Sequence, residues 1–400
     1  MFTKTIDTPV LLCYTNRRAA VFVRSARRYH RKRGTFEMKK KEYSIRKDHL
    51  GCDFVVELPA SRAGDPVRVL QITDPQIIDS SQIRETDALS KEEIRAWGPD
   101  SFDRQCGNHI RSLIEQTKPD LIFITGDIVY GRFDDNGTAL ARICALLDTF
   151  CVPWAPVFGN HDNESLVGVT YQCGLFEKSE YCLFKRGNVT GNGNYTVGIA
   201  IGDSLVRVLH MLDSNGCTHS EDASVEKRCG IYPDQFELVA ARTAEIRRAA
   251  GRDVPAFMAF HIPHFIFHEA ELAKGYVTPE RFYYVLGVDV VAEDGDFGFK
   301  NDSCDGFRTS VDIAEFAKDH HIEAIFIGHH HNTATVIHYR GIALVFGLKT
   351  GQYDSYVPGN IGGTLITLQG DEYAIVNVSS CCPYGPVPRG QMRYRGFFGE

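Results

Sequence analysis

The chain has 400 residues, of which 43% are hydrophobic and 11% aromatic, and its formal net charge is −7. Such a composition supports a globular core, and no apolar run approaches the ~18 residues that a membrane-spanning helix needs. The acidic balance argues against general nucleic-acid binding, which requires a basic surface. We therefore expect a soluble body with no membrane span and no nucleic-acid partner.

The first 47 residues differ in charge from the rest of the chain. They contain 14 Lys and Arg residues against 3 Asp and Glu residues, a local charge of +11, which leaves −18 for residues 48–400. An Arg-rich, acid-poor start resembles a mitochondrial transit peptide, but a disordered basic tail or a misplaced start codon explains it as well. We expect residues 1–47 to form a disordered basic extension and residues 48–400 to form a single domain.

After residue 50, short apolar runs alternate with stretches of helical periodicity. The runs predicted as strands are Val67–Thr73, Leu121–Thr125, Trp154–Phe158, Val206–Leu212, Ala256–Phe260, Ala324–Ile327 and Ile342–Phe346. The stretches predicted as helices are Asp103–Thr117, Thr138–Phe150, Pro233–Ala250 and Ser310–His320. Residues 164–194 and 262–303 are predicted as long loops, which in compact domains are more often functional than decorative. The alternation of strands and helices predicts an α/β layered domain.

Polar side chains directly follow five of the predicted strands. In chain order they are Asp74, Gly126-Asp127, Gly159-Asn160-His161-Asp162, His261 and Gly328-His329-His330-His331. Carboxylate, amide and imidazole donors that converge from several segments suit a pair of metal ions bridged by one carboxylate. The glycines allow the backbone to turn sharply as it leaves each strand. Taken singly, Asp74 is explained as well by a cap or a turn, and His261 by a core histidine.

The order of these motifs resembles a known family. The series D-x-Q, GDxxY, GNHD, a single histidine and GHxH looks like the calcineurin-like metallophosphoesterases, which include the purple acid phosphatases. The segments Tyr232–Gln235, Phe260–Pro263 and Gly347–Tyr356 are similar to the purple-acid-phosphatase-like branch, and the resemblance runs from about Val67 to about Gly359. It implies an α/β fold, namely the four-layer α/β/β/α sandwich of the metallo-dependent phosphatases.

The resemblance also implies a dinuclear metal centre. The first ion would be held by Asp74, Asp127 and His331, and the second by Asp127, Asn160, His261 and His329, with Asp127 as the bridge. A hydroxide between the ions would attack phosphorus. His161 would act as the acid at the phosphate or the leaving oxygen, and Asp162 would orient it.

Position 76 departs from the family pattern. Many members carry a histidine where this chain has Gln76, whereas purple acid phosphatases lack it and take a tyrosine ligand from GDxxY, here Tyr130. If Tyr130 ligates, we expect Fe(III) paired with Fe, Zn or Mn. If Gln76 or water completes the site, we expect a colourless centre of Mn, Zn or Fe(II). Packing beneath the site is the alternative role for Tyr130.

The activity that this resemblance implies is metal-dependent hydrolysis of a phosphoric ester. A monoester is favoured, carried by a phosphorylated small molecule or a phosphoprotein. The alternatives are a phosphodiesterase that acts on nucleotides or lipid head groups and a binding module that kept the fold without turnover.

The compartment is predicted only from weak signals. A cytoplasmic location is expected because no secretory signal is evident, but the basic N-terminus and six N-x-S/T sequons point to mitochondria or to secretion. Cys173, Cys182, Cys217 and Cys229 could pair in an oxidising compartment. Free thiols are the expectation for a cytoplasmic enzyme.

Overall fold

The computed structural model describes residues 42–82, 102–216, 229–278, 280–286, 295–302, 306–351, 360–380 and 389–394. All of these residues lie in one compact unit, Lys40–Glu400. Most of the predicted basic extension, residues 1–41, lies outside the described residues. Strand β1 (Ser44–His49) begins inside that predicted extension, so the folded domain starts earlier than residue 48.

The larger of two sheets has ten strands in the order β1-β2-β6-β7-β8-β11-β13-β12-β10-β9. Besides β1 these are β2 (Cys52–Leu58), β6 (Tyr195–Ile201), β7 (Ser204–Met211), β8 (Ala256–Ala259), β9 (Tyr284–Leu286), β10 (Phe297–Lys300), β11 (Ile322–Ile327), β12 (Thr333–Tyr339) and β13 (Ile342–Phe346). Strands β7, β8, β11 and β13 run parallel. Their carboxyl ends therefore meet at one edge of the sheet.

The smaller sheet has six strands in the order β16-β15-β14-β3-β4-β5. They are β3 (Val67–Ile72), β4 (Leu121–Thr125), β5 (Trp154–Val157), β14 (Gly362–Gln369), β15 (Glu372–Ser379) and β16 (Arg389–Tyr394). Strands β3, β4 and β5 are parallel. Aromatic rings join the two sheets, since the Phe123 ring on β4 meets the Phe326 ring on β11 edge to face at 5.4 Å.

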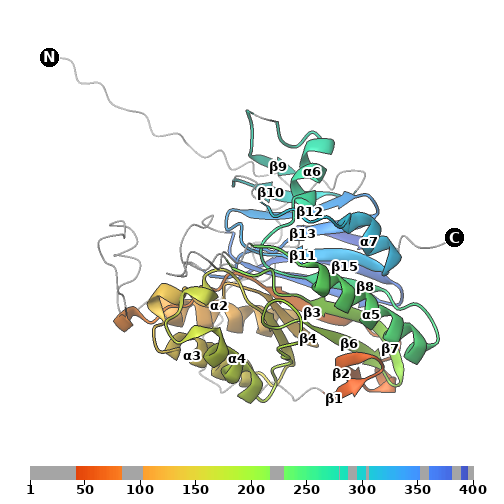
Figure 1. Ribbon diagram of the computed structural model, residues 1–400, viewed down its shortest axis with the longest axis horizontal. Helices are drawn as coiled ribbons and strands as arrows, with labels where there is room; N and C mark the ends of the chain where they lie inside the picture. The colour runs from red at the N-terminus through yellow and green to blue at the C-terminus, as the bar shows by residue number, and fades with distance from the viewer. Residues whose placement is uncertain are drawn as a thin grey trace, which may run out of the picture. The chain divides into compact units, whose positions relative to one another are not determined.

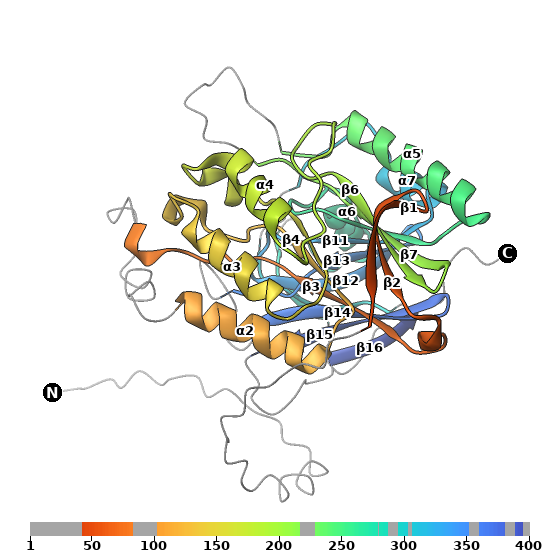
Figure 2. The ribbon, with the colours of Figure 1, turned by 90° about the horizontal axis from the view of Figure 1, so that it is seen from below.

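Helices cover the outer faces of both sheets. They are α2 (Phe102–Thr117), α3 (Thr138–Asp148), α4 (Gly168–Lys178), α5 (Pro233–Ala250), α6 (Ile266–Ala273) and α7 (Ile313–Asp319), with short 3₁₀ turns at Ala60–Arg62, Ser80–Gln82, Gly131–Phe133 and Asp162–Glu164. α2 packs against β3 and β14, α5 against β7, and α7 against β11 and β13. Figures 1 and 2 show the two sheets between these helix layers. The expected four-layer α/β/β/α sandwich is therefore confirmed.

Every predicted strand and helix is present, with ends that move by a few residues. The helix expected from Ser310 begins at Ile313, because the Asp312 side chain accepts hydrogen bonds from Ala314 N and Glu315 N and so caps it. The two predicted long loops were wrong in part. The first contains α4, and the second contains α6, β9 and β10.

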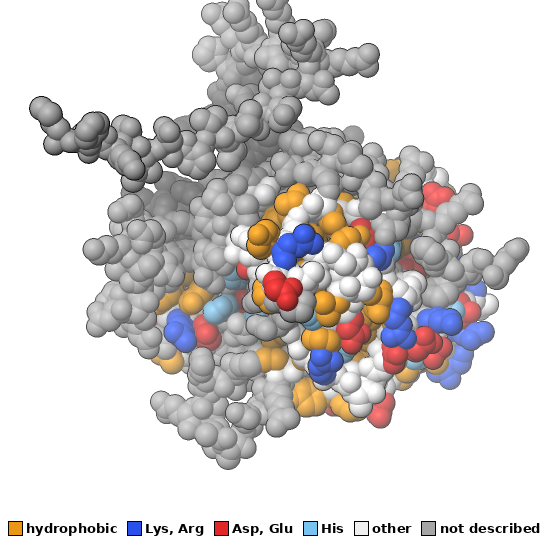
Figure 3. Space-filling model, turned by 90° about the horizontal axis from the view of Figure 1, so that it is seen from above, with side chains coloured by type: hydrophobic (Ala, Val, Ile, Leu, Met, Phe, Trp, Pro, Cys, Tyr) orange, Lys and Arg blue, Asp and Glu red, His pale blue; other side chains and the backbone are white. Residues whose placement is uncertain are grey.

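The end of the domain near α6 and β9 carries several exposed hydrophobic side chains (Figure 3). They are Leu272, Phe282, Tyr283 and Val285. A cavity of about 690 Å³ lies beside them, lined mainly by aromatic and aliphatic side chains of β9 and β10. None of the predicted metal ligands lines this cavity.

Two further observations concern the cysteines and the helices. Among the described cysteines, Cys173 and Cys182 are free thiols, whereas Cys229 is disulfide-bonded. No described helix combines the length and the apolar character that crossing a membrane requires.

His210 on β7 gives the folded domain a dependence on pH. Its side chain is buried, and Nδ1 lies 3.1 Å from Thr196 Oγ1. Burial lowers the pKa of His210 from 6.5 to about 3, and the nearby charges of His320 and Arg242 act in the same direction. Between these pH values only the unfolded chain binds the proton, so the free energy of unfolding should fall as the pH falls below 6.5. We expect His210 alone to lower the free energy of unfolding by about 2 kcal/mol at pH 5.

Urea unfolding at pH 7.5 and pH 5 checks this expectation. A His210→Gln variant removes the titrating group and keeps a hydrogen-bonding side chain. It should lose about 2 kcal/mol less than the wild type between the two pH values. An equal loss in both proteins would show that His210 does not contribute.

Candidate metal centre

The predicted ligands lie together where strands of both sheets end. β3 leads to Asp74, β4 to Asp127 and β5 to Asn160 in the smaller sheet, and β8 leads to His261 and β11 to His329 and His331 in the larger one. Asp127, His261 and His329 form one group of potential ligand atoms, and Asp74, Asp127 and His331 form a second. Within each group these atoms lie within 4.8 Å of one another. Asp127 belongs to both groups, which is the arrangement that a bridging carboxylate requires.

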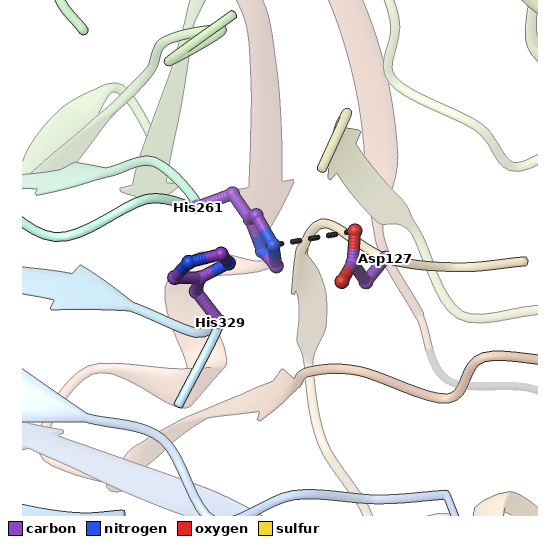
Figure 4. Close-up of side chains that lie close together, drawn as sticks. All are labelled: Asp127, His261 and His329. Carbon is purple, nitrogen blue, oxygen red and sulfur yellow. Dashed lines mark ion pairs between the residues drawn. The ribbon is translucent and has the colours of Figure 1, made fainter. Parts of the chain in front are cut away.

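His261 is fixed in the tautomer that a metal ligand needs. Its Nδ1 lies 2.7 Å from the carbonyl oxygen of Thr125, which can only accept, so Nδ1 carries the proton. Nε2 then faces Asp127 Oδ1 at 3.2 Å and Asn160 Oδ1 at 3.1 Å. Figure 4 shows His261, His329 and Asp127 directed toward one another. His329 Nδ1 lies 2.9 Å from the same Asn160 oxygen, so four expected ligands of one ion converge.

The second group is built around Asp74. Its carboxylate lies 3.3 Å from His331 Nε2 and accepts a hydrogen bond of 2.6 Å from Thr73 Oγ1. The backbone N–H of His329 also donates to it at 3.2 Å. The carboxylate is therefore oriented by neighbours on both sheets.

The backbone is strained at three of these residues. Asp74, Asp127 and His329 adopt positive φ values of 49°, 48° and 75°. Such conformations cost side-chain-bearing residues on the order of 1–3 kcal/mol and cluster at functional sites. Hydrogen bonds hold them in place, since Asp127 O accepts from Gln76 N at 2.9 Å and Asp74 O accepts from Gly351 N at 3.2 Å.

Two glycines leave room for the ligands. A Cβ atom at Gly126 would lie 2.7 Å from the His261 ring, and one at Gly328 would lie 2.6 Å from Asp74 Oδ2. Side chains approach this closely only where no Cβ intervenes. The glycines predicted to turn the chain thus also allow the ligands to pack against the backbone.

The electrostatics of the cluster favour a bound cation. Burial alone would raise the pKa of Asp127, but the charges of His261 and His161 hold it well below its usual range. Asp74 is likewise held low against burial, by a hydrogen bond to His331 and the charge of His261. Asp127 in turn raises the pKa of His261 to about 9 against the effect of burial. Without a metal ion the site holds a proton on His261, and a metal ion would replace it. The donor set therefore fits hard or borderline metal ions.

The predicted acid, His161, lies at the rim of this cluster and is partly exposed. Its backbone N–H donates to Asp127 Oδ1 at 2.9 Å, and its ring stacks on the Tyr130 ring at 4.3 Å. Its Nδ1 lies 2.9 Å from Glu164 Oε2. Arg132 Nε lies 3.6 Å from the other Glu164 oxygen. Glu164 therefore orients the imidazole and leaves Nε2 as the outer nitrogen.

We expected Asp162 to orient His161, and the structure places it differently. The Asp162 carboxylate is buried and accepts hydrogen bonds from Val129 N at 2.9 Å and Gly159 N at 2.7 Å. It thus ties the two ligand-bearing loops together. The reason is geometric, because neighbours in a helical turn diverge whereas residues i and i+3 share a face. The signal for Glu164 was present in the sequence as an acid three residues after His161.

The two residues of uncertain role occupy defined places. Tyr130 stacks between His161 and Phe133, whose ring centroid lies 5.4 Å away. Its ligation stays a prediction. The Gln76 side chain is buried between Asp127 Oδ2 and the ammonium of Lys349. Sequence reasoning missed Lys349, and a lysine just after the apolar strand at residues 342–346 was the available signal.

Comparisons with known proteins identify the family of the chain. Residues 67–333 match the family model described as calcineurin-like phosphoesterase. The chain is 29% identical to "Phosphatase DCR2" of Saccharomyces cerevisiae over 237 residues, which are 54% of this chain and 39% of the relative. It is 24% identical to "Probable inactive purple acid phosphatase 28" of Arabidopsis thaliana over 245 residues, 56% of each protein.

One solved structure is also similar to the chain. Purple acid phosphatase PPD1 from yellow lupin (Lupinus luteus) seeds is 12% identical, with a TM-score of 0.48, over 86% of this chain and 56% of that one. The chain spans 39% of the length of the first curated relative named above and 56% of the second. The purple acid phosphatase relative supports the expected branch. Since the family model covers the whole stretch from β3 to the start of β12, the chain belongs to the calcineurin-like phosphoesterase family.

Proposed function

We propose that the chain is a metal-dependent phosphoric ester hydrolase with a dinuclear centre. The observation that carries the proposal is the pair of overlapping ligand groups that share Asp127. One ion would be held by Asp74, Asp127 and His331, and the other by Asp127, Asn160, His261 and His329. Two ions held there would supply positive charge to phosphoryl oxygens and would activate water.

The protein's own contribution at the reacting ester would come from His161. Glu164 engages Nδ1, so Nε2 is the atom that can pass a proton to the leaving alcohol oxygen. The hydrogen bond that the His161 backbone N–H donates to Asp127 Oδ1 fixes this histidine relative to the ligand cluster. An alkyl monoester and an alkyl diester would both need that proton, and the monoester is favoured because of the resemblance to the purple-acid-phosphatase-like branch. The substrate class would be a phosphorylated small molecule or a phosphoprotein.

The relatives bear on whether turnover is retained. One relative is named a phosphatase, and another is named a probable inactive purple acid phosphatase. A non-catalytic binding module is the alternative that the second name raises. In this chain the described residues keep both ligand groups and His161 in place, which favours an enzyme.

Turnover of p-nitrophenyl phosphate and bis-p-nitrophenyl phosphate tests the proposal. The chain loaded with Mn(II), Zn(II) or iron should hydrolyse the monoester faster than the diester. A chelator should remove the activity toward both esters. Faster diester hydrolysis would replace the monoester assignment with a phosphodiesterase. Absence of turnover with every metal, in a folded chain that binds metal, would favour the binding module.

Glu164→Gln is expected to slow turnover without emptying the site. The change removes the charge that orients His161, so kcat for an alkyl phosphate should fall about tenfold or more. The KM and the metal content should stay unchanged, because Glu164 belongs to neither ligand group. The matched control is Glu177→Gln, which removes an acid that pairs with Arg186 at the surface. Equal effects of the two changes would contradict the orienting role.

A further inference from the structure

Lys349 is a buried cation beside the metal ligands. It follows β13, and only 1% of its surface is exposed. Its Nζ donates to Gln76 Oε1 at 2.6 Å and to the carbonyl oxygen of Asp74 at 3.2 Å. A lysine is rarely buried to this extent unless its charge has a defined purpose or partner.

The backbone around Lys349 is fixed to the segment that carries Asp74. Thr350 N donates to Thr73 O at 2.9 Å, and Thr73 N donates to Thr350 Oγ1 at 3.3 Å. Gly351 N donates to Asp74 O at 3.2 Å. The position of the ammonium relative to Asp74 is therefore set by several hydrogen bonds.

Lys349 also decides what Gln76 can do. A charged lysine only donates, so the Gln76 atom that faces it is the carbonyl oxygen. The amide nitrogen then faces Asp127 Oδ2 at 3.3 Å, where a carboxylate can only accept. The oxygen with which Gln76 was expected to bind a metal is thus engaged by Lys349. The side chain instead links the ammonium to the shared carboxylate.

A fixed charge here acts unequally on metal ions of different charge. Asp74 and Asp127 offer two negative charges to the subsite that includes His331, and Lys349 opposes them with one positive charge. Coulomb repulsion grows in proportion to the charge of the ion. The repulsion therefore weakens the binding free energy of an Fe(III) ion by one and a half times as much as that of a divalent ion. Lys349 is also among the charges that hold the pKa of Asp74 low, so it acts on this carboxylate directly.

We propose that Lys349, held against Gln76, is a metal-selectivity residue that makes the subsite of Asp74, Asp127 and His331 a site for a divalent ion and disfavours Fe(III). The inference rests on the proposed dinuclear centre and assigns the oxidation state of one of its ions. The hydrogen bonds of Lys349 to Gln76 Oε1 and Asp74 O place its charge beside the Asp74 subsite, so the preference of the subsite of Asn160, His261 and His329 should change less.

Metal binding to charge-removing variants tests this proposal. Metal-free wild type, Lys349→Met, Lys349→Gln and Lys349→Arg chains are each titrated with Mn(II) and with Fe(III) in the presence of a competing chelator. Bound metal is counted by elemental analysis and Fe(III) by its absorption and electron paramagnetic resonance. The ratio of Fe(III) to Mn(II) affinity should rise about tenfold or more in the Met and Gln variants. The Arg variant keeps the charge and should resemble the wild type.

The outcomes separate the inference from the function on which it rests. Thermal unfolding of the metal-free chains establishes which variants fold. If the Met variant does not fold, the affinity ratio of the Gln variant, which can still donate to Gln76 Oε1, provides the test. An unchanged affinity ratio in a folded, metal-binding variant overturns the role of Lys349 and leaves the metal centre standing. A wild-type chain that binds neither metal overturns both.

Discussion

Replacing Asp127 with asparagine should reduce phosphoester turnover by about a thousandfold or more, which corresponds to about 4 kcal/mol of transition-state stabilisation. Asp127 is the residue common to both ligand groups, and its carboxylate meets His261 Nε2 at 3.2 Å. Asparagine keeps the shape but removes the charge, so both subsites lose their shared ligand. The bound metal should fall in parallel with kcat, as measured by elemental analysis of the purified variant.

The fold should survive this change, which makes the result interpretable. Asp127 is buried beside protonated histidine in the metal-free protein, and asparagine still offers an oxygen to the His161 backbone. Asp134→Asn is the matched control, because Asp134 is also buried but accepts hydrogen bonds from Ala139 N and Leu140 N at the start of α3. The control should lose stability and keep its metal. Full metal-dependent turnover in Asp127→Asn would sink the assignment of the site.

The second large effect is expected from His161→Asn and should depend on the leaving group. Proton transfer by a positioned side chain contributes on the order of 10²–10⁴-fold to a rate. An alkyl phosphate needs that proton and should lose about this factor in kcat. A p-nitrophenyl ester leaves as a stabilised phenolate and should lose much less.

Metal content distinguishes this loss from damage to the centre. His161 contacts Asp127 through its backbone N–H, and that contact persists in the variant. Both ions should therefore remain bound. If the two esters lose the same factor, or if metal is lost along with activity, His161 is not the acid.

The ligand cluster could be predicted because each ligand directly follows an apolar strand. The residues of β4 and β11 are buried throughout, so their apolar runs stand out in the sequence. What periodicity could not show was that five strand ends from two different sheets converge. The order of the motifs grouped the ligands, and in the structure these strand ends lie close together.

Other parts of the fold left weak sequence signals for physical reasons. β1 reads as part of the basic extension because an edge strand with exposed side chains tolerates charge. α4 contains two glycines, which are poor helix formers, and it is held by packing, as where Phe176 meets Trp154 edge to face at 5.9 Å. α6 has only eight residues, which is too short for a periodic pattern to be convincing.

The residues missed at the site show the same limits. Glu164 lies one turn after His161, and a local helical argument could have found it. Lys349 is separated from Asp74 by 275 residues in sequence. The pairing of β14 with β3, and the hydrogen bonds of Thr350 and Gly351 with Thr73 and Asp74, bring the two together.

The most direct test of the metal centre is elemental analysis of the purified wild-type chain, combined with turnover before and after chelation. We expect two metal ions per chain, loss of phosphoester hydrolysis when they are removed, and recovery when a divalent metal is restored. A folded chain that binds no metal after reconstitution, or one that hydrolyses the ester equally well without metal, would contradict this expectation.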